Sequence, residues 1–105
     1  MHSRREEQSL EMHRRIAGML LANPRQVLGK AMANLELWRE RREGASAQSS
    51  ALEWQNLLTH ASPEEISSFL VSGDEKSMRM RQSSPFAGVL SPREVWAIKR
   101  GHETT

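Results

Sequence analysis

The sequence contains no cysteine and no tyrosine, and few residues that favour β-strands. Without cysteine, the chain cannot form disulfides, a thiolate nucleophile or a cysteine-ligated zinc or iron–sulfur site. Because tyrosine, valine and isoleucine are enriched in strands, their scarcity argues against a β-sheet. Leu, Ile, Val and Phe together make up only 20 of the 105 residues, so we expect a folded protein with a thin hydrophobic core.

Long apolar runs and a strong net charge are also missing. No apolar run approaches the roughly 18 residues that a membrane span needs. Charged residues follow the first methionine closely, where a signal peptide would place its apolar stretch, so we expect a cytoplasmic protein that does not contact a membrane. The formal net charge is only +2. A chain of this length has room for one small domain.

The motifs of common enzymes are absent as well. The sequence has no glycine-rich phosphate loop, no nucleophile elbow and no HExxH motif. Its four histidines show no metal-ligand spacing, and no histidine or lysine marks a serine as a nucleophile. We therefore predict that the protein is not an enzyme and has no metal, cofactor or small-molecule ligand. His13 is expected to be a packed core histidine.

Helix-start signals, in contrast, are frequent. Asn23, Ser50, Ser62 and Ser91 each precede Glu or Gln by three positions, which is the spacing of a capping box. Three of these four residues are followed by proline, which favours the first helical position. The pattern predicts an all-α protein, a single domain of five to six helices, over about residues 4–22, 24–43, 50–59, 63–72, 75–82 and 92–100.

The remaining segments are predicted to be non-helical. Residues 44–49 are small and polar and are expected to form a mobile linker. Residues 1–5 and 101–105 are expected to be disordered. Residues 83–91 form a loop that is unusually apolar, so we expect it to pack against another part of the molecule.

The second predicted helix has an apolar stripe of normal width. Val27, Ala31, Leu35 and Trp38 fall on one arc, as is typical of a helix that faces a core. Leu35 and Trp38 are therefore expected to be buried.

The first predicted helix is different, because its apolar residues spread over about 200° of the helix. Such a helix is either sandwiched within its own chain or contacts a second chain. The candidate contacts with a second chain or a second copy are Met12 and Met19 of this helix, together with Leu37 of the second predicted helix.

The segment from residue 79 to residue 96 has the composition of a binding interface. On the last helix, Val95 and Ile98 share a side, whereas Trp96 lies away from both of them, beside Arg93. Trp and Arg are the residue types that dominate binding energy at interfaces. The predicted partner-binding residues are Arg79, Arg81, Phe86, Arg93 and Trp96. In the alternative interpretation, Phe86 and Trp96 close the core and the arginines contact DNA phosphates.

A helix–turn–helix motif can be tested against residues 63–82. Gly73 would be the glycine of the turn, followed by a basic recognition helix. The motif needs a small residue about four positions before that glycine, where this chain has Phe69, and Arg79 stands where an apolar residue is expected. Aligned on Gly73, the residue pattern of a helix–turn–helix motif therefore does not match this segment. DNA contact therefore remains an alternative, carried by Arg79, Arg81, Arg41 and Arg42 on phosphates.

The C-terminal third resembles a known class of proteins. The run RMRQSSPFAGVLSPRE (79–94), followed by Trp96, is similar to the ending of short bacterial antitoxin-type proteins that are encoded beside toxin genes. The runs MHRRIA, LLANP and NLELW are similar to their beginnings, and the resemblance covers about residues 10–98. It implies an antitoxin that binds and neutralises a partner toxin. A small basic DNA-binding or transcriptional regulatory protein is the alternative.

Overall fold

A computed structural model of the chain describes residues 4–41 and 45–103. These residues contain α-helices and no strand, so the expected all-α fold is confirmed. The helices are α1 (Arg4–Ala22), α2 (Pro24–Arg41), α3 (Ala45–His60), α4 (Pro63–Leu70), α5 (Glu75–Arg81) and α6 (Pro92–Glu103).

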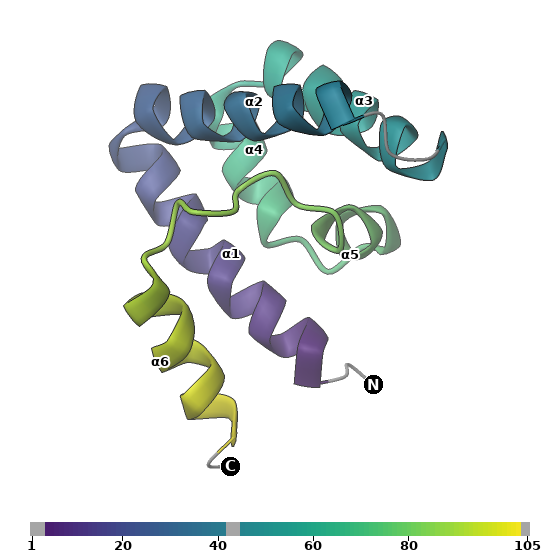
Figure 1. The fold of residues 1–105 in the computed structure, drawn as a ribbon. Helices are drawn as coiled ribbons and strands as arrows, with labels where there is room; N and C mark the ends of the chain where they lie inside the picture. The colour runs from purple at the N-terminus through teal and green to yellow at the C-terminus, as the bar shows by residue number, and fades with distance from the viewer. Residues whose placement is uncertain (1–3, 42–44, 104–105) are drawn as a thin grey trace.

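Helix α1 is the central element of the fold. It contacts α2, α4, α5 and α6. In Figure 1, α2 and α3 lie together across one end of the molecule, whereas α6 runs beside α1 at the end where both termini lie. The wide apolar face of α1 is thus used mainly within its own chain. Leu21, near the C-terminal end of α1, remains exposed.

Two of the predicted capping boxes begin helices in the structure. At the start of α4, the backbone N–H of Glu65 donates to Ser62 Oγ (3.1 Å), and the Ser62 N–H donates to the Glu65 carboxylate (2.9 Å). Ser91 and Glu94 make the same reciprocal pair at the start of α6, also at 3.1 and 2.9 Å. These bonds satisfy backbone N–H groups that the first turn of a helix leaves unpaired.

The helix bounds differ from the sequence-based expectations at three segment ends. Helix α3 begins at Ala45, so Ser50 lies inside the helix, and the predicted linker 44–49 is helical from residue 45 onward. This segment is rich in alanine and contains no proline, which allows a helix. Helices α1 and α6 also extend into the termini that were expected to be disordered, namely residues 4–5 and 101–103. Residues 1–3, 44 and 104–105 of these predictions lie outside the described part of the chain.

Trp54 of α3 stands at the centre of the hydrophobic core. It is fully buried, and its indole N–H donates to the backbone carbonyl of Met80 (3.0 Å). Its ring makes edge-on contacts with Phe69 and Phe86, with centroids 5.9 and 5.8 Å away. The side chain therefore joins α3, α4, α5 and the segment between α5 and α6 in a single core.

The apolar stripe of α2 is buried as expected at Val27, Ala31 and Leu35. Trp38 packs against the core but is only half-buried, so its expected burial is found in part. Trp38 lies about one turn before the end of α2, beyond the three buried residues of the stripe.

Candidate functional site

The structure divides the five predicted partner-binding residues into two groups. Phe86 and Arg81 are buried, with only 3% and 8% of their surfaces exposed. Arg79, Arg93 and Trp96 are exposed. The buried pair has structural roles within this chain, whereas the exposed three remain accessible to a partner.

Phe86 belongs to the segment 82–91, which packs against the core as its apolar composition indicated. Asn34 of α2 holds this segment by donating hydrogen bonds from its side-chain amide to the carbonyls of Pro85 (2.7 Å) and Ala87 (2.9 Å). Gly88 adopts a φ of 84°, in the left-handed region that favours glycine, and an added Cβ there would meet Lys30 Cε at 3.0 Å. Phe86, which was predicted to bind a partner, is therefore buried within its own chain.

His13 of α1 holds the same segment from the other side. Its Nδ1–H donates to the carbonyl of Ser9 (2.7 Å), and because a carbonyl can only accept, Nε2 is the ring nitrogen that accepts from the Ser84 hydroxyl (2.8 Å). The ring also packs edge-on against Phe86. The expected packed histidine is thus found, with a hydrogen-bond partner 71 positions away that spacing in the sequence did not indicate.

This arrangement makes stability sensitive to mild acid. Burial, together with the nearby positive charge of Arg81, lowers the pKa of His13 below its usual 6.5, although the bond to Ser9 opposes the shift. The unfolded chain binds the proton more readily, so the contribution of neutral His13 to stability is complete above pH 6.5 and is lost as the pH falls below it. Urea unfolding at pH 7.5 and pH 5.5 should show a lower free energy of unfolding at the lower pH.

His13→Gln should flatten this dependence, since the carboxamide of glutamine does not titrate. His60→Gln, at an exposed position near the end of α3, is the matched control. An unchanged slope between pH 7.5 and 5.5 in the His13 variant would contradict the assignment.

Arg81 of α5 donates hydrogen bonds to backbone carbonyls at the C-terminal end of α4. Its Nη1 donates to the carbonyls of Leu70 (3.2 Å) and Ser72 (2.7 Å), which lie at and just beyond the last turn of that helix. Carbonyls at a helix C-terminus lack intrahelical donors, and a cation there also interacts well with the helix dipole. Arg81, which was predicted to bind a partner, is therefore mostly buried and stabilises the fold.

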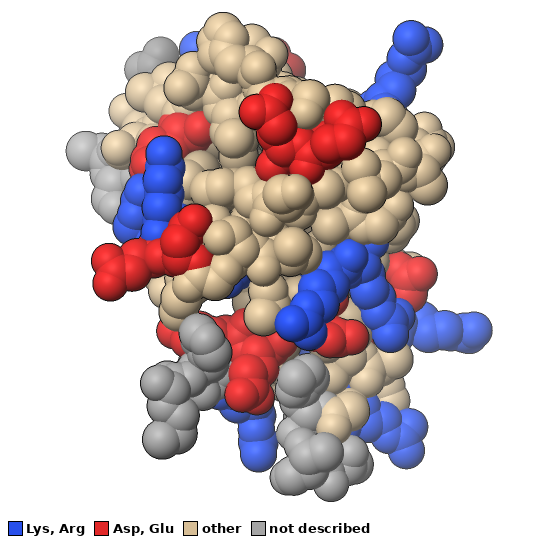
Figure 2. Space-filling view, turned by 180° about the vertical axis from the view of Figure 1, so that it is seen from behind, with Lys and Arg blue, Asp and Glu red and all other residues tan. Residues whose placement is uncertain are grey.

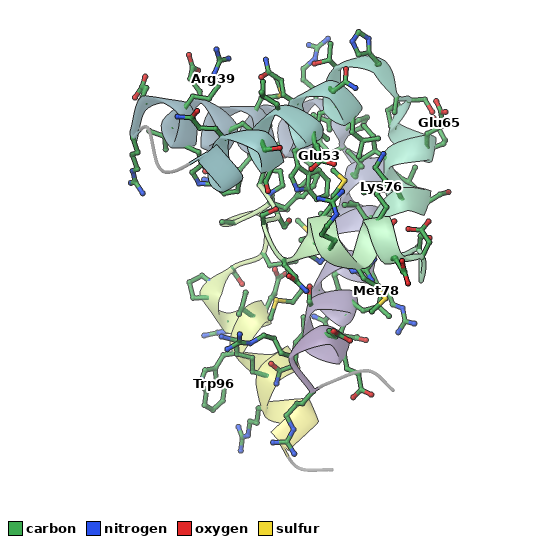
Figure 3. The ribbon with its side chains drawn as sticks, turned by 90° about the vertical axis from the view of Figure 1, so that its right-hand side faces the viewer. Arg39, Glu53, Glu65, Lys76, Met78 and Trp96 are labelled. Atoms are coloured by element: carbon green, nitrogen blue, oxygen red, sulfur yellow. The ribbon has the colours of Figure 1, made fainter. Side chains whose placement is uncertain are left out.

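Arg79, two residues earlier on α5, points to the surface. Its guanidinium donates two parallel hydrogen bonds to the Glu53 carboxylate of α3, at 2.9 and 2.8 Å. The bonds from Arg79 hold the pKa of Glu53 below its ordinary value, and the positive charge of Lys76 acts in the same direction. Figure 3 shows Glu53 and Lys76 on the same side of the molecule. Arg79 is thus exposed but already paired.

Trp96 is the most exposed of the large hydrophobic side chains in the described residues. With 61% of its surface exposed, it projects from α6 in Figure 3, and the guanidinium of Arg100 lies 5.1 Å from its ring centroid. Ile98 is buried and Val95 half-buried, so the predicted orientation of this helix is confirmed. The outer face of α6, which we define as Arg93, Trp96 and Arg100, combines an aromatic ring with cations.

The predicted second interface is present only in part. Met19 and Leu37 are exposed, with Leu37 the more accessible of the two. Met12 is half-buried and packs against the core, so it is less available to another chain than expected.

The surface gives little support to a DNA-binding interpretation. Two of its predicted phosphate contacts are engaged within this chain, since Arg81 is buried and Arg79 is paired with Glu53. Arg41 is exposed, and Arg42 lies outside the described residues. On the face shown in Figure 2, acidic and basic side chains are interspersed among the described residues, without the continuous basic surface that tracks a phosphate backbone.

Two further findings concern the described residues as a whole. None of their helices is both long enough and apolar enough to cross a membrane. Within the same ranges, no three His, Cys, Asp or Glu side chains gather in a way that could hold a metal ion. In comparisons with known proteins, no family model, curated protein or solved structure matches this chain.

Proposed function

We propose that this protein binds and neutralises a partner protein, as an antitoxin binds its toxin, and that the outer face of α6 anchors the partner. The exposure of Trp96 is the observation that carries the proposal. A large aromatic side chain that remains in water loses the favourable free energy that burial would give. Trp and Arg are also the residue types most enriched among those that dominate protein interfaces.

The surrounding residues fit this role. Arg93 and Arg100 flank Trp96 at spacings of three and four residues, so the three side chains lie on one side of the helix. Helix α6 packs against α1 through its opposite side, where Ile98 is buried. A partner could therefore cover the outer face without disturbing the core. The resemblance of residues 79–94 to antitoxin-type proteins supports the same class of function.

The test is co-expression with the product of the neighbouring gene, followed by co-purification and measurement of cell growth. Trp96→Ala should weaken the complex by about twenty-fold or more, since an anchor of this kind contributes about 2 kcal/mol when buried in an interface. Leu52→Ala is the matched control because Leu52, on α3, is equally exposed at 60% and lies away from α6. It should leave binding unchanged.

Two results would count against the proposal. One is full protection of cells by the Trp96→Ala variant, which would remove the outer face of α6 from the interface. The other is tight binding of the wild-type protein to duplex DNA, with a steep dependence on salt and no protein partner, which is the behaviour of a phosphate-contacting protein.

A further inference from the structure

An open cleft lies between α1, the segment 82–91 and α6, on a part of the surface that the proposed function does not use. Its volume is about 550 Å³. This value lies within the range of roughly 300–1,000 Å³ that is typical of sites for small molecules. Helix α6 contributes Val95 and Lys99 to the cleft, whereas Trp96 does not line it.

The cleft has an apolar floor that the fold holds in place. Met12 and Ile16 of α1, Phe86 and Leu90 of the segment 82–91, and Val95 of α6 line it, and all five belong to the core or pack against it. The hydrogen bond between His13 and Ser84, which also line the cleft, fixes the two walls relative to each other. Such a floor suits an apolar group of a ligand.

The charged residues of the cleft all have the same sign. Arg5, Arg81 and Lys99 line it, and no Asp or Glu does. Arg81 is almost fully buried, yet within the described residues it has no ion-pair partner, because both of its hydrogen bonds go from Nη1 to neutral carbonyls. Two carboxylates act on Arg81 electrostatically: Asp74 is engaged at the start of α5, and Glu6 lines an adjoining cavity together with Arg5 and Arg81.

An anion that enters the cleft would form charge-assisted hydrogen bonds with the Arg81 guanidinium, which within the described residues bonds only to neutral carbonyls. The Nε and Nη2 groups of a guanidinium form a planar fork that matches the two oxygens of a carboxylate. Arg5 and Lys99 add further positive charge around the site.

In contrast to the sequence-based expectation of no small-molecule ligand, we propose that this cleft binds a small amphipathic carboxylate, with its apolar body on the floor and its carboxylate facing Arg81 and Arg5. The glutamine side chains of Gln8 and Gln82 also line the cleft and supply neutral donors for the same group. Binding at this site is independent of the outer face of α6, so it extends the protein's activity beyond capture of a partner.

The probe is 4-phenylbutyrate, titrated into the isolated full-length protein by calorimetry. A ligand of this size is expected to bind with a dissociation constant in the millimolar range or tighter. The neutral isostere 4-phenylbutyramide should bind about tenfold more weakly or not at all, since it cannot make charge-assisted hydrogen bonds. Equal binding of acid and amide, or no binding of the acid, would overturn the proposal.

Variants of the exposed cations that line the cleft test whether 4-phenylbutyrate binds there. Arg5 and Lys99 are exposed, so Arg5→Gln and Lys99→Gln should fold and should each weaken binding of 4-phenylbutyrate by about two- to fivefold. Arg25→Gln removes the same charge from α2, outside the cleft, and should have no effect. A loss of the same size in all three variants would show non-specific attraction and overturn the assignment. Because no partner is present, failure here leaves the partner-binding proposal untouched.

Discussion

Replacing Trp54 with alanine should lower the free energy of unfolding by about 3–5 kcal/mol, the largest effect expected for a single substitution in this chain. The change removes a fully buried indole and its edge-on contacts with Phe69 and Phe86. It also removes the indole N–H as a donor to the carbonyl of Met80, but that carbonyl keeps the backbone N–H of Ser83 as a donor (3.1 Å), so the lost packing dominates the effect. Urea unfolding followed by circular dichroism measures the change.

Trp96→Ala is the matched control for this prediction. The same residue type is removed, but from a position with 61% of its surface exposed, so the free energy of unfolding should change by no more than about 0.5 kcal/mol. If Trp54→Ala lowered stability by less than about 1 kcal/mol, the side chain could not be at the centre of the core.

Arg81→Met should also destabilise the protein, by about 2–3 kcal/mol. Methionine keeps much of the apolar length of the side chain but removes both hydrogen bonds to the carbonyls of Leu70 and Ser72. These bonds involve a charged donor in a buried place, where each bond is worth more than at the surface. Thermal and urea unfolding of the isolated protein measure the loss.

Arg79→Met is the control, because it also removes one positive charge from α5 but leaves the hydrogen bonds of Arg81 in place. Arg79→Met breaks an ion pair whose two side chains are 54% and 33% exposed, and such pairs contribute little to stability. Its stability should therefore remain close to that of the wild type. Equal destabilisation by the two variants would mean that the orientation of α5 has been misassigned.

Much of the secondary structure could be predicted because its signals are local. The serine caps at Ser62 and Ser91 each act within four residues of sequence, and both begin helices where they were expected. The position of Trp96 on α6 followed in the same way from its angle to Val95 and Ile98. The start of α3 was missed because Ser50 carries the same cap pattern inside a helix that begins five residues earlier.

The candidate site depends on contacts that no local pattern encodes. Arg79 and Arg81 are separated by about 200° around α5 and so meet different surroundings: Arg81 bonds to carbonyls at the end of α4, whereas Arg79 pairs with Glu53 of α3. Likewise, the burial of Phe86 depends on Trp54 and His13, which come from two other parts of the chain. The sequence indicated an apolar loop but not the surface that it covers.

The way in which the segment 82–91 is held has a consequence for the speed of folding. Its hydrogen bonds join residue 84 to residue 13 and residues 85 and 87 to residue 34, separations of 71, 51 and 53 positions. Most helical proteins fold quickly because their contacts are local, whereas contacts between distant residues require long loops to close first. The helices of this protein can therefore form early. Trp54, however, lacks its contact with Phe86 until the segment 82–91 docks onto the core. Completion of the core, rather than formation of its helices, should set the folding rate.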